Sequence, residues 1–170
     1  MHRPSSVSWL GQRIGAYEIL ALRRFRVKED KSTSVAEQDR LIGTWELNVA
    51  KSSYMPGPAP ISEIRTYARG PHGVEGTIER RFGDGRSERI EYVAEYDREY
   101  PVTGAHSYDH LLLKRIDAST AEAVLSHAGK VYGMARRVIA QDGRTMTITL
   151  RTEGVSNAIV NVALFQKIEP

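Results

Sequence analysis

Cysteine is absent from the sequence, which excludes disulfide bonds, thiolate zinc sites, iron–sulfur clusters and a cysteine nucleophile. Long apolar runs are absent too, and because a membrane-spanning helix needs about 18 consecutive apolar residues, we expect no transmembrane segment. The glycine motifs of phosphate and dinucleotide binding and the G-x-S-x-G elbow of hydrolases do not occur. The sequence therefore lacks the usual motifs of nucleotide-binding proteins and of the common serine hydrolases.

Excess positive charge is confined to the N-terminal quarter of the 170-residue chain. Residues 1–40 contain eight Lys or Arg and five Asp or Glu, a net charge of +3, whereas residues 41–170 contain sixteen of each. A nucleic-acid-binding domain carries a basic stripe on its folded body, and this body is neutral, so we expect no nucleic-acid partner. The length favours one domain over residues 41–170, preceded by an extension or linker over residues 1–40.

The beginning of the chain carries no secretory signal as written. Residues 1–11 contain Arg3 and Pro4 and lack an apolar stretch of about 7–15 residues. We therefore expect a cytoplasmic protein, or a periplasmic or secreted one if the native start differs. The sequence leaves the oligomeric state open.

Short strands separated by turn signals fill the chain from Gly43 onward. Asp-Gly pairs at residues 84–85 and 142–143 favour tight hairpins, because a type I′ turn needs positive φ at both central residues. Further turn signals include Ala128-Gly129 and Glu153-Gly154, and the even spacing is typical of consecutive antiparallel hairpins. The predicted strands lie near 44–49, 61–69, 73–82, 86–97, 109–116, 119–127, 130–140, 144–153 and 157–168.

Period-two alternation gives the predicted strands one apolar and one polar face. The clearest apolar sets are Val74, Ile78 and Phe82; Ile90, Tyr92, Ala94 and Tyr96; and Met146, Ile148 and Leu150. Sequential strands without an intervening helix leave two sheet edges, and closing the sheet removes both. We therefore predict an all-β fold, an antiparallel up-and-down β-barrel of roughly eight to ten strands around a cavity, with a two-sheet sandwich as the alternative.

Several segments in order carry a family resemblance over residues 43–168. They are Gly43-Thr-Trp-Glu-Leu-Asn48, Lys51-Ser52, Pro56-Gly-Pro-Ala-Pro60, Tyr96-Asp-Arg-Glu-Tyr-Pro-Val-Thr-Gly104, Leu113-Lys-Arg-Ile-Asp117, Arg136-Arg-Val138 and Asp142-Gly-Arg-Thr145. Together they resemble the small bacterial lipocalin-like (calycin) domains. The resemblance implies a lipocalin-like barrel in which Trp45 heads the first strand and closes the bottom. It implies no single activity, because that fold carries binders and some enzymes.

The densest polar cluster is the predicted loop over residues 95–110. His106, Asp109 and His110 could form a His–Asp general base, and we take them as candidate catalytic residues. Asp97, Glu99 and Asp109 could supply oxygens to a divalent cation, Ca²⁺ or Zn²⁺, without matching a known metal motif. A solvated rim loop is the alternative interpretation of the same residues.

Two adjacent arginines must point to opposite faces of their strand. Because Tyr132, Met134 and Val138 share the parity of Arg136, we predict Arg136 inside the barrel and Arg137 outside. A buried guanidinium needs an acidic partner, which could be Glu122 or a ligand carboxylate. The candidate ligand-binding residues are Arg136, Tyr92, Tyr96, Arg80, Met134 and Met146.

Three functional hypotheses remain open at this point. The first is a barrel that binds a small apolar or acyl ligand with a polar head in its cavity. The second is a small hydrolase of an ester or lactone with an acyl chain, using the 95–110 loop for a metal-activated water or a histidine base. The third is a structural or interaction module. The first two share a small-molecule partner and differ in whether the loop groups converge.

Overall fold

A computed structural model describes residues 39–152 and 159–168 of the chain. Eleven strands are found in this part, together with one short 3-10 turn, η1 (Val49–Lys51). The strands are β1 (Gly43–Leu47), β2 (Ser53–Met55), β3 (Ser62–Gly70), β4 (Gly73–Arg81), β5 (Ser87–Ala94), β6 (Glu99–Pro101), β7 (His110–Arg115), β8 (Thr120–His127), β9 (Lys130–Ile139), β10 (Thr145–Thr152) and β11 (Val160–Ile168).

The strands form one antiparallel sheet in the order β5-β4-β3-β1-β11-β10-β9-β8-β7-β6, and β2 pairs with β11. Apart from the β1–β11 and β1–β3 pairings, neighbours in the sheet are consecutive in sequence. The sheet ends, β5 and β6, are linked through Glu91 and Thr103, whose backbone N–H groups donate to each other's carbonyls at 3.1 and 3.0 Å. The result is a nearly closed barrel, which confirms the predicted fold class.

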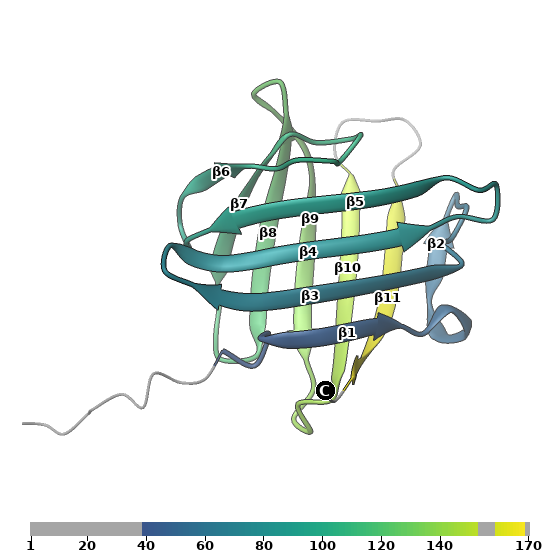
Figure 1. Cartoon of the computed structure of the whole chain (residues 1–170), viewed down its shortest axis with the longest axis horizontal. Helices are drawn as coiled ribbons and strands as arrows, with labels where there is room; N and C mark the ends of the chain where they lie inside the picture. Colours follow the sequence, from purple (N-terminus) through teal and green to yellow (C-terminus); the bar gives the residue numbers. More distant parts are fainter. Residues whose placement is uncertain (1–38, 153–158, 169–170) are drawn as a thin grey trace, which may run out of the picture. The chain divides into compact units, whose positions relative to one another are not determined.

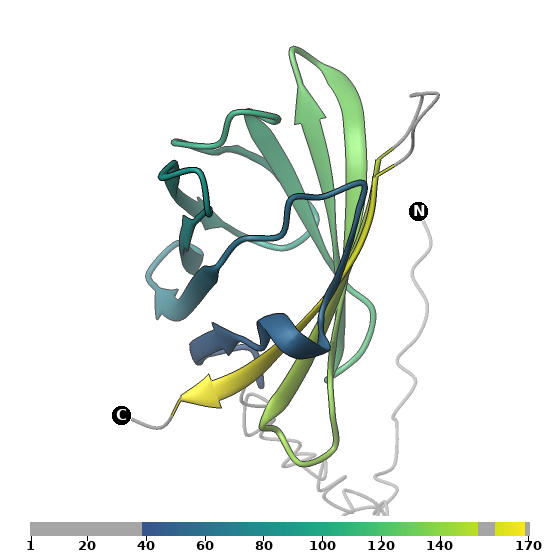
Figure 2. The same ribbon diagram turned by 90° about the vertical axis from the view of Figure 1, so that its right-hand side faces the viewer.

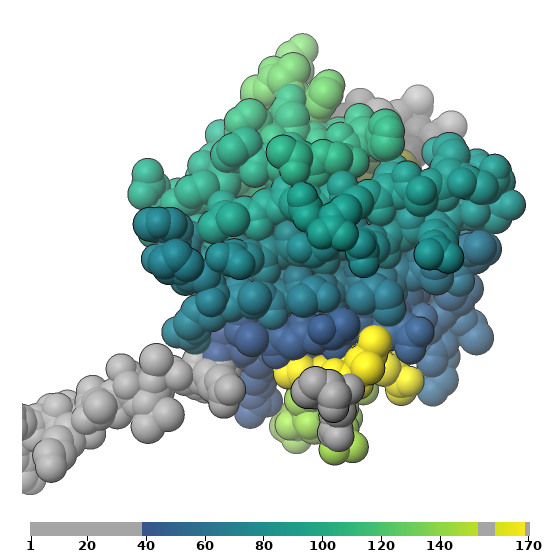
Figure 3. Space-filling model, in the orientation of Figure 1, coloured from purple at the N-terminus to yellow at the C-terminus, as the bar shows by residue number. Residues whose placement is uncertain are grey.

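The barrel is flattened into two layers that cross steeply. In Figure 1, β1, β3, β4 and β5 run across the front of β7 to β11, and Figure 2 shows the two layers from the side. The front layer forms a continuous surface on this side of the molecule (Figure 3). Side chains that point inward from either layer therefore meet in one interior.

Nine of the eleven strands coincide with the nine predicted ones to within a few residues. The two missed strands, β2 and β6, have three residues each, too few to show an alternation. No helical crossover joins any of the predicted strands within the described residues. The predicted turn at residues 153–154 and all but the last two residues of the predicted extension 1–40 lie outside the described residues.

The predicted turn positions are correct, but their type is not. At Asp84-Gly85 and Asp142-Gly143 only the glycine has positive φ, 89° and 68°, and each aspartate accepts a hydrogen bond from the backbone N–H two residues later. A type I′ conformation needs two positive φ values. Ala128 and Gly129, between β8 and β9, meet that condition with φ of 48° and 75°.

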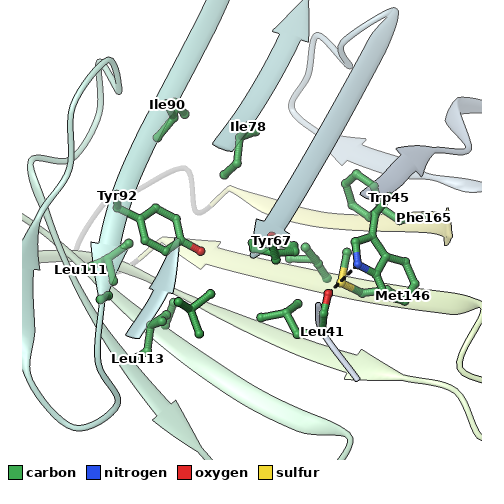
Figure 4. Close-up of a cluster of buried hydrophobic side chains, with 14 of the residues drawn as sticks. Leu41, Trp45, Tyr67, Ile78, Ile90, Tyr92, Leu111, Leu113, Met146 and Phe165 are labelled. Atoms are coloured by element: carbon green, nitrogen blue, oxygen red, sulfur yellow. Dashed lines mark hydrogen bonds between the residues drawn. The ribbon is translucent and has the colours of Figure 1, made fainter. Parts of the chain in front are cut away.

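The closed end of the barrel is filled by large apolar side chains. Trp45 is fully buried, and its indole N–H donates to the backbone oxygen of Leu41 at 2.8 Å. Met146 and Phe165 are also fully buried at this end (Figure 4). Trp45 therefore packs as a core residue, since its one polar atom has a partner and the ring contributes its full apolar area to the core, while its closing of the barrel stays a prediction.

Within the described residues, no helix has the length and apolar character needed to cross a membrane.

Candidate functional site

The barrel interior contains a cavity of about 90 Å³. Its apolar wall comes from both layers and consists of Ile78, Leu111, Leu113, Ala123, Leu125, Ala135, Ile148 and Leu150. Its polar wall consists of Arg65, Arg80, Arg137, Tyr67, Tyr92 and Tyr108. Figure 4 shows Tyr67 of β3 and Tyr92 of β5 directed into this interior. The cavity therefore combines an apolar wall with three arginines and three tyrosines.

Gly76 on β4 makes room for the ring of Tyr92. A Cβ at this position would lie 2.3 Å from the Tyr92 Cζ atom, closer than any real contact. Gly76 and Tyr92 are paired across the β4–β5 ladder. Because the glycine has no side chain, the tyrosine hydroxyl can extend across the neighbouring strand into the cavity.

Two of the three arginines are neutralised by carboxylates. Glu63, which is 2% exposed, contacts Arg65 Nε at 2.5 Å and Arg80 Nε at 3.3 Å. Arg80 also contacts Glu88 at 3.3 Å. Burial alone would lower the pKa of Arg65, but the Glu63 carboxylate together with Tyr67 and Tyr108 outweighs burial and raises it. Each of these two guanidinium groups therefore already has an acidic partner.

Arg137 has no carboxylate partner among the described residues, whereas Arg80, whose buried Nε also lacks a hydrogen-bond partner, lies next to two carboxylates. The Arg137 side chain is 5% exposed, and its Nε and Nη2 atoms are buried without a hydrogen-bond partner among the described residues. Its guanidinium carbon lies 5.3 Å from the ring centroid of Tyr67, a cation–π arrangement. Buried polar groups without partners are rare in native proteins and call for an explanation. The free guanidinium edge of Arg137 is the feature on which the site depends.

The three cavity tyrosines differ in their electrostatic surroundings. Burial raises the pKa of Tyr92 and of Tyr108. Burial would also raise the pKa of Tyr67, but the guanidinium groups of Arg65 and Arg137 outweigh it and lower the pKa. Arg65 Nη1 donates to the Tyr67 hydroxyl oxygen at 3.4 Å. Among these three tyrosines, only Tyr67 has a pKa below the ordinary value.

The predicted orientation of the arginine pair is wrong. Arg137 points inward, whereas Arg136 is exposed and contacts Glu122 at 3.1 Å on the outer surface. The β9–β10 register pairs Arg137 with Ile148, and paired residues share a face, so the inward Ile148 places Arg137 inside. The inner face of β9 also carries Gly133 and Ala135, and these small residues give that face a weaker apolar pattern than the outer face with Tyr132, Met134 and Val138.

Some of the predicted ligand-binding residues line the cavity and others lie elsewhere. Tyr92 and Arg80 line the cavity as predicted, although their role in binding stays a prediction. Met146 is buried at the Trp45 end and does not line the cavity, and Met134 is 38% exposed on the outer face. Tyr96 lies near the closed end and donates to the Asp39 carboxylate at 2.9 Å. Arg136 and Met134 are therefore not cavity residues.

The 95–110 segment brings only some of its candidate groups together. His110 Nδ1 lies 2.9 Å from Asp109 Oδ1, while His106 lies 3.1 Å from Glu88 instead. The backbone N–H of Ala128 and the His110 ring hold the pKa of Asp109 below its usual value. The His110–Asp109 pair has the spacing of a general base, but neither residue lines the cavity, and its catalytic role stays a prediction.

The proposed metal ligands have separate partners. Glu99 accepts a hydrogen bond from the Ser126 hydroxyl at 2.7 Å, Asp109 pairs with His110, and the Asp97 backbone N–H donates to Leu113. Within 39–152 and 159–168, no three histidine, aspartate or glutamate side chains are grouped so as to hold a metal ion. The predicted Ca²⁺ or Zn²⁺ site therefore finds no support in the geometry.

Comparison with known proteins bears on the fold. A Schistosoma mansoni fatty acid binding protein in complex with arachidonic acid matches with a TM-score of 0.56 and 11% identity, covering 78% of this chain and 99% of that chain. This chain has that barrel fold. A zebrafish ileal bile acid-binding protein complexed with cholic acid covers 76% of this chain and 99% of that chain, with a TM-score of 0.45 and 9% identity. No protein-family model and no curated protein matches the chain, so the bacterial lipocalin-like group is not supported.

Most of the residues that make the interior polar are not among those predicted from the sequence. Glu63, Arg65 and Tyr67 alternate along β3, but their parity set is charged and was not recognised as an inward face. Tyr108 belongs to the segment between β6 and β7, and its ring lies against Tyr132 with centroids 6.4 Å apart. These side chains could have been identified as inward-facing from two observations together. Residues 63, 65 and 67 share one face of β3, and β3 pairs with β4, whose inward face shows a clear apolar alternation.

Proposed function

We propose that the barrel binds a small organic anion, a carboxylate with an apolar body, in the interior cavity. The observation that carries this proposal is the free edge of Arg137. Nε and Nη2 lie on the same side of the planar guanidinium, and their two N–H bonds match the two oxygens of a carboxylate. Leaving them unpaired costs about 1–3 kcal/mol for each group, and a bound carboxylate removes that cost.

The apolar wall and the volume of the cavity define the rest of the ligand. About 90 Å³ is less than the roughly 150 Å³ cavity known to hold benzene, so a head group and a few carbon atoms fit the barrel as it stands. A longer tail would have to leave the cavity. Arachidonic acid, the ligand of the Schistosoma mansoni protein, is also a carboxylate with an apolar tail.

The test is calorimetric titration of the full chain with butyrate and with butyramide, which has the same shape and no charge. Butyrate is expected to bind and butyramide to bind far more weakly. Hexanoate and decanoate extend the series, and affinity should increase by about 0.8 kcal/mol per methylene until the cavity is filled.

Two neighbouring variants supply the matched comparison. Arg137→Met should weaken butyrate binding at least about thirtyfold, because a charged hydrogen-bonding partner is worth about 2 kcal/mol or more. Arg136→Met changes the same residue type on the outer face and should leave binding unchanged. Equal butyrate affinity in wild type and Arg137→Met would overturn the proposal.

A further inference from the structure

The barrel interior carries more positive than negative fixed charge. Arg65 and Arg80 are paired with the carboxylates of Glu63 and Glu88, which leaves the charge of Arg137 without a carboxylate. Placing an isolated charge in a medium of low dielectric constant is costly, so buried charges are normally paired. Something beside Arg137 must balance its charge when the cavity holds no ligand.

Tyr67 is the group in position to do so. Among the described residues that line the cavity, the ionisable groups besides the arginines are the phenols of Tyr67, Tyr92 and Tyr108. Tyr67 lies under the Arg137 guanidinium and accepts a hydrogen bond from Arg65 on its own strand. Arginines also act on Tyr92 of β5 and on Tyr108 before β7, but burial outweighs them and raises both pKa values, and only Tyr67 combines the Arg65 hydrogen bond with the contact to Arg137.

We propose that Tyr67 is ionised in the empty barrel and acts as the counter-ion of Arg137, and that an anionic ligand replaces it while Tyr67 takes up one proton. The inference rests on the proposed function, since it assumes that an anion enters the cavity. The surroundings that lower the pKa of Tyr67 support it. No bond other than that to the proton changes: the phenolate oxygen gains a proton from solvent, or from the neutral acid form of the ligand.

This exchange keeps the interior charge constant. The ligand carboxylate brings one negative charge to Arg137, and protonation of Tyr67 removes one. Binding is therefore coupled to proton uptake, so affinity should decrease as pH rises above the range in which Tyr67 ionises, by at most tenfold per pH unit for one proton. A barrel whose tyrosine stays protonated would show no such dependence.

Near-ultraviolet absorption tests whether Tyr67 is ionised in the empty barrel, because tyrosinate has its own absorption band and no ligand is needed. A tyrosinate signal equivalent to one residue is expected well below pH of about 10, where an ordinary tyrosine is protonated. Tyr67→Phe should abolish the signal, and Tyr92→Phe and Tyr108→Phe should keep it. Absence of tyrosinate from the wild-type spectrum below that pH would overturn the inference.

Calorimetric titration with butyrate in two buffers of different ionisation enthalpy tests whether binding is coupled to proton uptake. Wild type should take up about one proton per butyrate, and Tyr67→Phe should take up none and lose the pH dependence. Binding by wild type without proton uptake would also overturn the inference. Failure of butyrate to bind any variant would refute the proposed function instead, and the absorption spectrum would still decide the state of Tyr67.

Discussion

Replacing Arg137 with methionine should stabilise the empty barrel while removing its ligand site. Arg137 is 5% exposed, and two of its N–H-bearing nitrogens have no partner among the described residues. Methionine has a similar length, fills the space with apolar atoms and adapts to its surroundings. The free energy of unfolding should therefore increase in a variant that no longer binds an anion.

The magnitude follows from the contacts of the guanidinium. Two unpaired buried groups cost about 1–3 kcal/mol each, so their removal favours the folded state by about 2–6 kcal/mol. The cation–π contact with Tyr67, which is lost, is worth about 0.5–2 kcal/mol, and Tyr67 without this cation takes up a proton and is neutral in the variant. A net stabilisation of about 0–5 kcal/mol remains, in line with other replacements of buried charges by apolar side chains.

Urea unfolding of the full chain without ligand measures this difference directly. The transition midpoint should increase for Arg137→Met with an unchanged slope, since the surface exposed on unfolding is nearly the same. Arg136→Met, whose side chain is 55% exposed, should change stability by no more than about 0.5 kcal/mol. A loss of more than about 1 kcal/mol in Arg137→Met would show that Arg137 is a structural partner rather than a ligand-binding group.

Three other changes test the fold and its charges. Glu63→Gln should destabilise the barrel by about 3 kcal/mol in urea unfolding, because it removes the carboxylate paired with Arg65 and one of the two paired with Arg80, whereas Glu79→Gln in an exposed pair should reduce stability by under about 1 kcal/mol. Similar losses in the two variants would contradict this reasoning. Gly104→Ala should reduce the free energy of unfolding more than Gly85→Ala, since both glycines have positive φ but only a Cβ at 104 would lie 1.8 Å from a backbone oxygen. Gly104→Ala should also accelerate amide exchange where Thr103 pairs with Glu91 of β5. Burial raises the pKa of Tyr54 to about 12, so the folded chain keeps a proton that the unfolded chain releases above about pH 10, and stability should fall as pH rises through this range. Tyr54→Phe should reduce that alkaline loss, and an unchanged profile would show that Tyr54 is not its source.

The sequence by itself determined the number and order of the long strands. Alternation of Ile90, Tyr92 and Ala94, and of Met146 and Ile148, identifies the inward faces of their strands, and all five side chains are buried. Alternation is a local property of neighbouring residues, so it survives without knowledge of the fold. Glycine at 85 and 143 also marks turns from the sequence, because positive φ is cheap for that residue.

Only the tertiary structure decided which charged residues face inward. Arg136 and Arg137 are chemically identical, and the choice between them depends on the register of β9 against β10. A shift of one residue moves every side chain of a strand to the other face. Local apolarity favoured Arg136, whereas the pairing of Arg137 with Ile148 placed Arg137 in the interior.

The composition of the cavity was equally beyond the sequence. Arg65 and Tyr67 lie on β3 and Arg137 on β9, with three strands between them in the sheet, and they meet because the sheet closes on itself. Their shared environment, rather than any one residue, leaves a guanidinium edge free and lowers the pKa of Tyr67. Such effects depend on burial and on distances across the barrel, which only the closed sheet determines.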